Sequence, residues 1–197
     1  MDFRVYDAIN AFVGRHEWLA DGFGGIEATA PVALAVATFG LWLLARPGAE
    51  RKWKLASAAA LASAGLALLV NQLVARFWHR PRPYEAHPAV HTWVARSHDP
   101  SFPSDHASAA FGIAFAVLMF DRLAGAMFVG AAALIGLGRV LVGVHYPGDV
   151  LAGMLVGLGS AVLVARLARP LLGSLVQLAE RITDPVVAPL WRRLPRH

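Results

Sequence analysis

The stretch that decides the fold is Leu55–Ala75, LASAAALASAGLALLVNQLVA, a run of 21 residues without a charged side chain. A helix of about 20 residues spans the roughly 30 Å hydrocarbon core of a bilayer, so this run predicts a transmembrane helix. A small soluble domain has too little interior to bury several such runs, which disfavours a soluble all-helical core. The four further apolar stretches are Ala28–Ala45, Ala107–Phe120, Leu123–Val144 and Val150–Ala165.

The composition of the 197-residue chain also departs from that of a soluble domain. The residues A, V, I, L, M, F, W, Y and C make up 57% of it and charged residues 16%, against about 25% charged residues in soluble proteins. The mean hydropathy is +0.52. The chain has no cysteine, which excludes disulfides and cysteine-ligated metals. The basic residues behind the net charge of +5 sit at the ends of apolar runs, so we expect the bilayer, and no nucleic acid, as a partner.

An amphipathic segment precedes the apolar stretches. Residues 1–27 contain five acidic side chains and lack the apolar core of a signal peptide. Apolar residues at helical spacing predict a surface helix over Phe3–Leu19. We therefore expect an all-α, polytopic membrane helix bundle with about five transmembrane spans, the third of which lengthens if its helix begins at Ser104. The expected parts are the surface segment 1–27, a membrane-embedded domain over 28–169 and a basic tail over 170–197.

The distribution of Lys and Arg between the loops predicts the orientation. If five spans alternate, eleven basic residues collect on one side and seven on the other. The positive-inside rule places the larger group in the cytoplasm, so the N-terminus is expected outside and the basic tail inside. The eleven are Arg46, Arg51, Lys52, Lys54, Arg122, Arg166, Arg169, Arg181, Arg192, Arg193 and Arg196, and the seven are Arg4, Arg15, Arg76, Arg80, Arg82, Arg96 and Arg139.

Polar residues gather at the four span ends that this alternation brings to one membrane face. Arg80–Pro83 (RPRP) follows the second span, and Pro103–His106 (PSDH) opens the third. Arg139 lies near the end of the fourth span, and His145–Asp149 (HYPGD) opens the fifth. We expect these four segments to form one site.

The residue types in these segments are those of an anion site. Helix N-termini offer unpaired N–H groups and a partial positive charge, and arginine binds phosphate oxygens in a bidentate manner. Ser104 is a predicted N-cap and Pro147 a predicted first-turn residue, which places His145 just before a helix. Asp149 is within reach of that imidazole, and a carboxylate on one ring nitrogen leaves the other free to attack. His106 is placed to protonate a departing oxygen.

Each of these residues also has a purely structural interpretation. His145 and Asp149 can form a capping pair, His106 can be a buried, hydrogen-bonded histidine, and Arg80 and Arg82 can anchor the membrane surface. Four further histidines lack the close spacing of metal ligands, so we expect them to line a loop over the site. They are His79, His87, His91 and His98.

Two features of the apolar spans predict contacts between helices. Asn71 and Gln72 need polar partners in the bilayer, and pairing between helices is favoured over orienting the arginine segment. Gly153 and Gly157 form a GxxxG pattern, which predicts close helix packing.

The pattern Arg-Pro, Pro-Ser-x-His and Arg-x5-His-x3-Asp resembles the three motifs of the type 2 phosphatidic acid phosphatase superfamily. The resemblance covers roughly Asn71 to Gly153, and the motifs occur in the family's order. It implies catalysis without a metal or other cofactor, through a phosphohistidine. By resemblance His145 is the nucleophile, Asp149 supports it, His106 is the general acid, and Arg82, Arg139 and Ser104 bind the phosphate.

The motifs depart from the family pattern in places. Ala75 stands where the family has a lysine, seven residues before its motif arginine, and Arg76 or Arg80 is the predicted substitute in phosphate binding. Gly138 stands where the family usually has serine. Asp105, which we count with the phosphate site, stands where the family often has glycine. Since like charges repel, it is expected to bind a hydroxyl, to pair with an arginine or to be protonated.

The segments Ser101–Ala107 (SFPSDHA) and Gly143–Asp149 (GVHYPGD) are similar to the bacterial undecaprenyl-diphosphate phosphatases of the bacitracin-resistance type. This similarity implies hydrolysis of undecaprenyl diphosphate to undecaprenyl phosphate on the outer face of a bacterial plasma membrane. The alternatives are a phosphatidic acid or phosphatidylglycerophosphate phosphatase and, in a different class, a non-catalytic lipid-phosphate binder or transporter. A soluble vanadium haloperoxidase shares the anion-site pattern, but it lacks the transmembrane spans expected here. The sequence leaves open whether the chain forms a homo-oligomer.

Overall fold

The computed structural model describes residues 2–45, 47, 51–167 and 169–192, and this part of the chain is helical and contains no strand. The all-α prediction is confirmed. In chain order the elements are α1 (Asp2–Gly14), α2 (Glu17–Leu44), α3 (Lys52–Phe77), α4 (Pro83–Ala86), α5 (Asp105–Leu118), α6 (Arg122–Leu141), α7 (Pro147–Val162), the π-helical segment η1 (Leu163–Leu167) and α8 (Arg169–Arg192).

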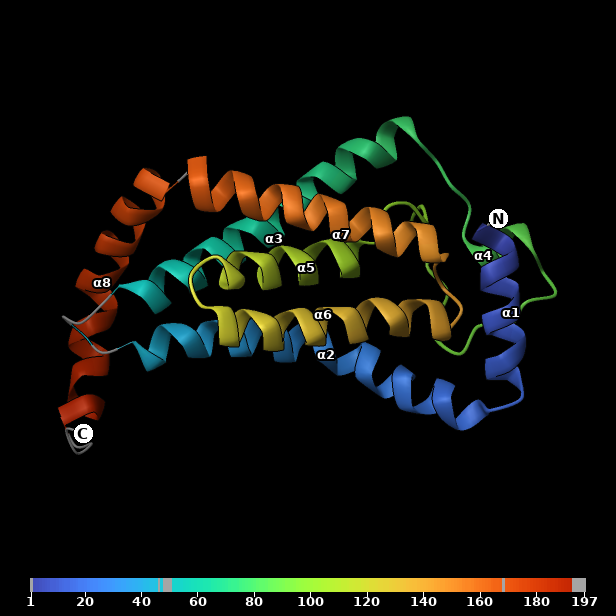
Figure 1. The fold of residues 1–197 in the computed structure, drawn as a ribbon, viewed down its shortest axis with the longest axis horizontal. Helices are drawn as coiled ribbons and strands as arrows, with labels where there is room; N and C mark the ends of the chain where they lie inside the picture. Colours follow the sequence, from blue (N-terminus) through green and yellow to red (C-terminus); the bar gives the residue numbers. More distant parts are fainter. Residues whose placement is uncertain (1, 46, 48–50, 168, 193–197) are drawn as a thin grey trace.

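The helices α2, α3, α5, α6 and α7 run along the long axis of the molecule, and α1 and α8 cross its two opposite ends (Figure 1). The short helix α4 lies at the same end as α1. Among the described residues three helices are long and apolar enough to cross a membrane. They are Lys52–Phe77, Arg122–Leu141 and Pro147–Leu167, so the number of five spans stays a prediction.

The short third apolar stretch forms α5, which lies in the middle of the bundle. The predicted start is confirmed, since Ser104 caps the helix and Asp105 is its first residue. With 14 residues the helix is only about 21 Å long, less than the roughly 30 Å of a bilayer core. Nine of these residues are buried, because α3, α6 and α7 pack around it. A helix enclosed by other helices does not need the length of a lipid-facing span.

The N-terminal surface helix is shorter than predicted. It ends at Gly14, Arg15 and His16 form a turn, and a second helix begins at Glu17. The prediction of one helix over Phe3–Leu19 was therefore wrong at its C-terminal end. Glycine disfavours a helix interior, and an acidic residue favours a helix start, which explains the break. The expected boundary at residue 27 lies inside α2.

The basic tail expected over 170–197 forms the helix α8 as far as Arg192. It is held to the bundle by a buried cation, because Lys54 of α3, 3% exposed, binds Glu180 at 3.2 Å and Asp184 at 2.7 Å. Arg51 adds a contact of 3.0 Å to Glu180. Arg46, Arg193 and Arg196 of the predicted cytoplasmic group lie outside the described residues.

The predicted close packing at the GxxxG pattern is confirmed, and its partner is α5. A Cβ atom on Gly153 would lie 2.9 Å from the carbonyl oxygen of Ser104. A Cβ atom on Gly157 would lie 2.6 Å from the backbone nitrogen of Gly112. The two glycines thus bring α5 and α7 into backbone contact from the N-cap of α5 to its middle.

Candidate active site

The four polar segments meet at one end of the bundle, as predicted. Arg82, at the start of α4, donates to the carbonyl of Val144 over 3.3 Å, which joins the segment after α3 to the segment before α7. The backbone N–H of Ser104 donates to the carbonyl of Asp149 over 3.1 Å, which joins the start of α5 to the start of α7. In Figure 1 this end of the bundle is the one that α1 crosses.

His145 is buried in the turn before α7, with 2% of its surface exposed. Its Nδ1 lies 2.8 Å from the backbone carbonyl oxygen of Ser101. A carbonyl oxygen can only accept, so the proton is on Nδ1 and the lone pair is on Nε2. Nε2 lies 3.4 Å from Nη1 of Arg82. The nitrogen that is able to attack therefore faces a guanidinium group.

Burial also keeps this imidazole neutral. It lowers the pKa of His145 from 6.5 to about 4, and the charges of Arg139 and Arg82 act in the same direction. The carboxylate of Asp149 opposes them but does not cancel the effect of burial. A neutral ring retains its lone pair near neutral pH, which nucleophilic attack requires.

Asp149 is fully buried and accepts hydrogen bonds on both carboxylate oxygens. Oδ2 accepts from the hydroxyl of Ser101 at 2.6 Å and from the backbone N–H of Tyr146 at 3.0 Å. Oδ1 accepts from Arg80 at 2.6 Å. The predicted reach to the imidazole is confirmed, since Nδ1 of His145 lies 3.6 Å from Oδ2. The ring's short hydrogen bond, however, goes to the Ser101 carbonyl.

Arg82 and Arg139 are both 6% exposed and approach the imidazole from different elements. Nε of Arg82 donates to the carbonyl of Asp99 over 2.9 Å, which fixes its guanidinium beside the ring. Arg139 is in the last turn of α6, and its carbonyl accepts the backbone N–H groups of Val144 and His145 at 3.2 and 3.3 Å. Two buried cations next to a neutral nucleophile form a site suited to an anionic substrate.

The first turn of α5 carries three of the predicted residues. Ser104 is the N-cap, as predicted, and its hydroxyl accepts from the N–H of Ala107 at 3.4 Å. His106 is half-buried, and the charges of Asp105 and Arg82 act on it. Asp105 accepts from the side-chain amide of Asn71 at 2.7 Å. That amide is a partner outside the three options considered for Asp105, and it confirms that Asn71 pairs between helices.

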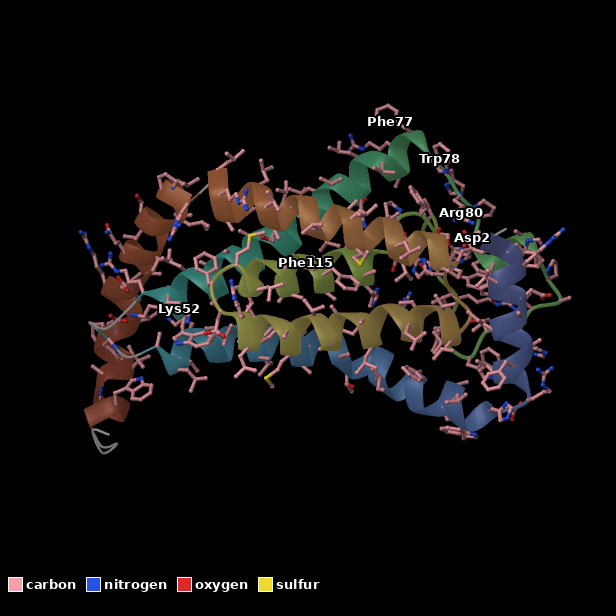
Figure 2. All side chains as sticks on the ribbon, viewed as in Figure 1. Asp2, Lys52, Phe77, Trp78, Arg80 and Phe115 are labelled. Carbon is pink, nitrogen blue, oxygen red and sulfur yellow. The ribbon has the colours of Figure 1, made fainter. Side chains whose placement is uncertain are left out.

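The two arginines proposed to replace the lysine at Ala75 lie in different environments. Arg76 is exposed in the last turn of α3. Arg80 binds Asp149 and, at 2.7 Å, also Asp2 of α1. In Figure 2 Arg80 and Asp2 lie together at the α1 end of the bundle. Burial alone would lower the pKa of Arg80, but these two carboxylates outweigh burial and raise it.

Two residues of the network were missing from the predicted site. Ser101 is fully buried and contacts both His145 and Asp149. It lies inside the quoted SFPSDHA segment, so its position close to the second motif was an available signal. Asp2 is distant in sequence from every motif and gave no such signal. Among the described residues no three His, Asp or Glu side chains are grouped as metal ligands.

Comparison with known proteins agrees with this geometry. Residues 52–171 match the model of the PAP2 superfamily. The undecaprenyl-diphosphatase BcrC of Bacillus subtilis is 31% identical over 193 residues, which cover 98% of this chain and 97% of that protein. The crystal structure of LpxE from Aquifex aeolicus superposes with a TM-score of 0.68 at 25% identity, covering 82% of this chain and 92% of that one.

A PAP2-type phosphatidylglycerolphosphate phosphatase from Bacillus subtilis has the same fold, with a TM-score of 0.63 at 23% identity. That match covers 86% of this chain and 85% of the other. The family match spans more than half of the chain and includes every motif on which the resemblance was based. The chain therefore belongs to the PAP2 superfamily, and it is a membrane phosphatase.

Proposed function

We propose that this phosphatase hydrolyses undecaprenyl diphosphate to undecaprenyl phosphate and inorganic phosphate, with His145 as the nucleophile. The observation that carries the mechanism is the bond from Nδ1 of His145 to the Ser101 carbonyl, because it leaves the lone pair on Nε2. The choice of lipid rests on the relative that matches almost the whole chain, BcrC of Bacillus subtilis, an undecaprenyl-diphosphatase.

The reaction takes place in two displacements at one phosphorus atom. In the first, the Nε2 lone pair of His145 attacks the terminal phosphorus, and the bond from that phosphorus to the bridging oxygen breaks. His106 donates a proton to the bridging oxygen, and undecaprenyl phosphate leaves. In the second, water attacks the phosphohistidine, the P–N bond breaks, His106 takes the proton from the water, and phosphate leaves.

The cations around the ring stabilise the charge that develops in both steps. We assign Arg82 and Arg139 to the phosphoryl oxygens, because both guanidinium groups are buried beside the imidazole. Ser104 lies at the N-terminus of α5, where unpaired backbone N–H groups also face an anion. Asp149 stabilises the positive ring as the new P–N bond forms.

We place the site on the outer face of a bacterial plasma membrane. The basic groups that the positive-inside rule assigns to the cytoplasm, including Arg51, Lys52 and Lys54, lie at the α8 end, opposite to the site. Residues 28–169 then form the membrane-embedded catalytic domain, with α1 on the outer surface and α8 on the cytoplasmic one. The lipid tail stays among the spans while the diphosphate enters the polar end.

The test is phosphate release by the purified chain in detergent, with and without a chelator. Undecaprenyl diphosphate, phosphatidylglycerophosphate and phosphatidic acid are compared at equal surface concentration. We expect the highest kcat/KM for undecaprenyl diphosphate, no effect of the chelator, and loss of activity in His145→Ala. Release that survives His145→Ala refutes the mechanism, and preference for another lipid refutes the substrate. No release from any lipid favours a binder or transporter.

A side-by-side comparison of three arginine variants ranks the cations. Arg82→Ala is expected to lose the most activity, because Arg82 is buried beside Nε2. Arg76→Ala and Arg80→Ala test which residue replaces the lysine at Ala75 in phosphate binding, because loss of the replacement raises KM. If neither variant raises KM, neither residue replaces the lysine.

A further inference from the structure

The buried face of α1 carries three polar residues spaced four apart, Asp2, Tyr6 and Asn10. Residues at this spacing lie on one face of a helix. Tyr6 is fully buried, Asn10 is 4% exposed, and each of the three is hydrogen-bonded to backbone outside α1. A helix that only rests on a membrane surface would bury apolar side chains there instead.

Two of these residues hold the two ends of the turn that carries His145. The hydroxyl of Tyr6 donates to the carbonyl of Gly143 over 3.1 Å. The carboxylate of Asp2 accepts from the backbone N–H of Gly148 at 2.9 Å. His145 lies between these two glycines. The surface helix therefore contacts the backbone on both sides of the nucleophile.

The same Asp2 continues into the side-chain network of the site. Its Oδ2 lies 2.7 Å from Nη2 of Arg80, whose Nη1 lies 2.6 Å from Oδ1 of Asp149. The Arg80 guanidinium also lies over the ring of Tyr146, 3.9 Å from its centroid. Arg80 is thus held in one orientation by the carboxylates of Asp2 and Asp149 and by the Tyr146 ring.

A buried carboxylate needs a compensating cation. Asp149 is 0% exposed, and within the described part of the chain its salt bridge to a permanently charged group comes from Arg80. Without Arg80, its other partners would be the neutral Ser101 hydroxyl, the Tyr146 N–H and the neutral ring of His145. Arg80 therefore supplies the compensating charge and fixes the orientation of Asp149 toward the imidazole ring.

We propose that Asp2 and Arg80 are positioning residues of the reaction, which act on His145 through Asp149 and the turn before α7. This proposal rests on the proposed function, because it takes His145 as the nucleophile. It makes the N-terminal helix part of the catalytic unit. The position of Arg80 in the first motif suggested phosphate binding, and this proposal assigns it a different role.

Phosphate binding and positioning by Arg80 predict different changes in KM and kcat when Arg80 is replaced. A phosphate-binding arginine contacts the substrate, so its loss raises KM and weakens inhibition by inorganic phosphate. A positioning arginine acts on the nucleophile, so its loss lowers kcat and leaves both of those constants unchanged. Its effect also depends on Asp149, because residues that act as a unit are not additive.

The experiment uses the purified full-length chain and a double-mutant cycle. Arg80→Gln is expected to lower kcat about 100-fold, the effect of a misplacement near 1 Å, and Arg80→Lys to recover part of it. Asp2→Asn is expected to lower kcat about tenfold, because it loosens Arg80 without removing it. In the Asp149→Asn background, Arg80→Gln should change kcat by less than about threefold. The controls are Arg4→Gln and Asp7→Asn, exposed residues of α1 that lose the same charges.

Two results overturn the proposal. The first is an Arg80→Gln enzyme with unchanged kcat, raised KM and weakened inhibition by inorganic phosphate. The second is full additivity of Arg80→Gln with Asp149→Asn. If Arg80→Gln does not fold, Asp2→Asn and Arg80→Lys decide by the same criteria, with folding checked by thermal unfolding. A wild-type rate in His145→Ala would refute the proposed function itself, so the two failures are distinguishable.

Discussion

Replacing Gly157 by alanine tests whether backbone contact between α5 and α7 builds the site. The added Cβ would lie 2.6 Å from the nitrogen of Gly112 and 2.8 Å from the carbonyl oxygen of Ser108, whereas ordinary contacts begin at 3.4 Å. Both neighbouring atoms belong to the backbone of α5, so no side chain can rotate away. The two helices must therefore separate by most of an ångström.

The expected loss follows from two opposing effects. Overpacking costs typically about 1–3 kcal/mol, and alanine in a helix gains about 1 kcal/mol over glycine. We expect a net destabilisation of up to about 2 kcal/mol, and each kcal/mol lowers the Tm by about 2–4 °C in a chain of this size. Activity should fall more, by up to about 100-fold, because the separation moves Ser104 and His106 away from His145.

Gly159→Ala is the matched control, because Gly159 is on the same helix and its Cβ would have nothing within 4 Å. This variant should melt at or above the wild-type temperature and retain its activity. Thermal unfolding in detergent and the phosphate-release assay measure both properties. If the Gly157→Ala and Gly159→Ala variants have the same Tm and the same kcat, backbone contact at Gly157 does not build the site.

Three further predictions follow from buried polar groups. Lys54→Met leaves Glu180 and Asp184 without their buried cation, and thermal unfolding should show a loss of about 1–3 kcal/mol. Lys52→Met, which breaks the more exposed pair with Asp121, should cost less stability than Lys54→Met, and equal losses would contradict this account. Because burial lowers the pKa of His145 from 6.5 to about 4, the folded state disfavours protonation, so its stability falls as pH drops through this window. At about pH 5 the free energy of unfolding is lower than at neutral pH by about 2 kcal/mol through His145, and His145→Gln should abolish this contribution. A variant with the pH dependence of the wild type would contradict the lowered pKa of His145. Ser101→Ala removes the 2.6 Å hydrogen bond to Asp149 and should lower kcat about tenfold. Ser174→Ala, at an exposed position of α8, serves as control, and a fully active Ser101→Ala would exclude a role for the hydroxyl.

Apolar periodicity and motif spacing predicted most of the fold and much of the site. Long uncharged runs such as Leu55–Ala75 form helices in any fold that buries them, and the capping residue Ser104 predicted the start of α5 correctly. The grouping of four loop segments followed from alternation of the spans. The prediction was wrong at the turn between α1 and α2, where hydropathy carries little information, and no secondary structure was predicted for the segment that forms α8.

The amino-acid sequence by itself determined which residues form the apolar spans and which histidines, arginines and carboxylates lie at their ends, because these patterns are local along the chain. Only the tertiary structure decided which arginine binds which carboxylate. Arg80 and Arg82 are neighbours in one motif, yet one binds Asp149 and Asp2 while the other faces His145. The physical reason is that chemically equal cations are distinguished by distance alone, and distances between residues far apart in sequence are set by packing of the helices.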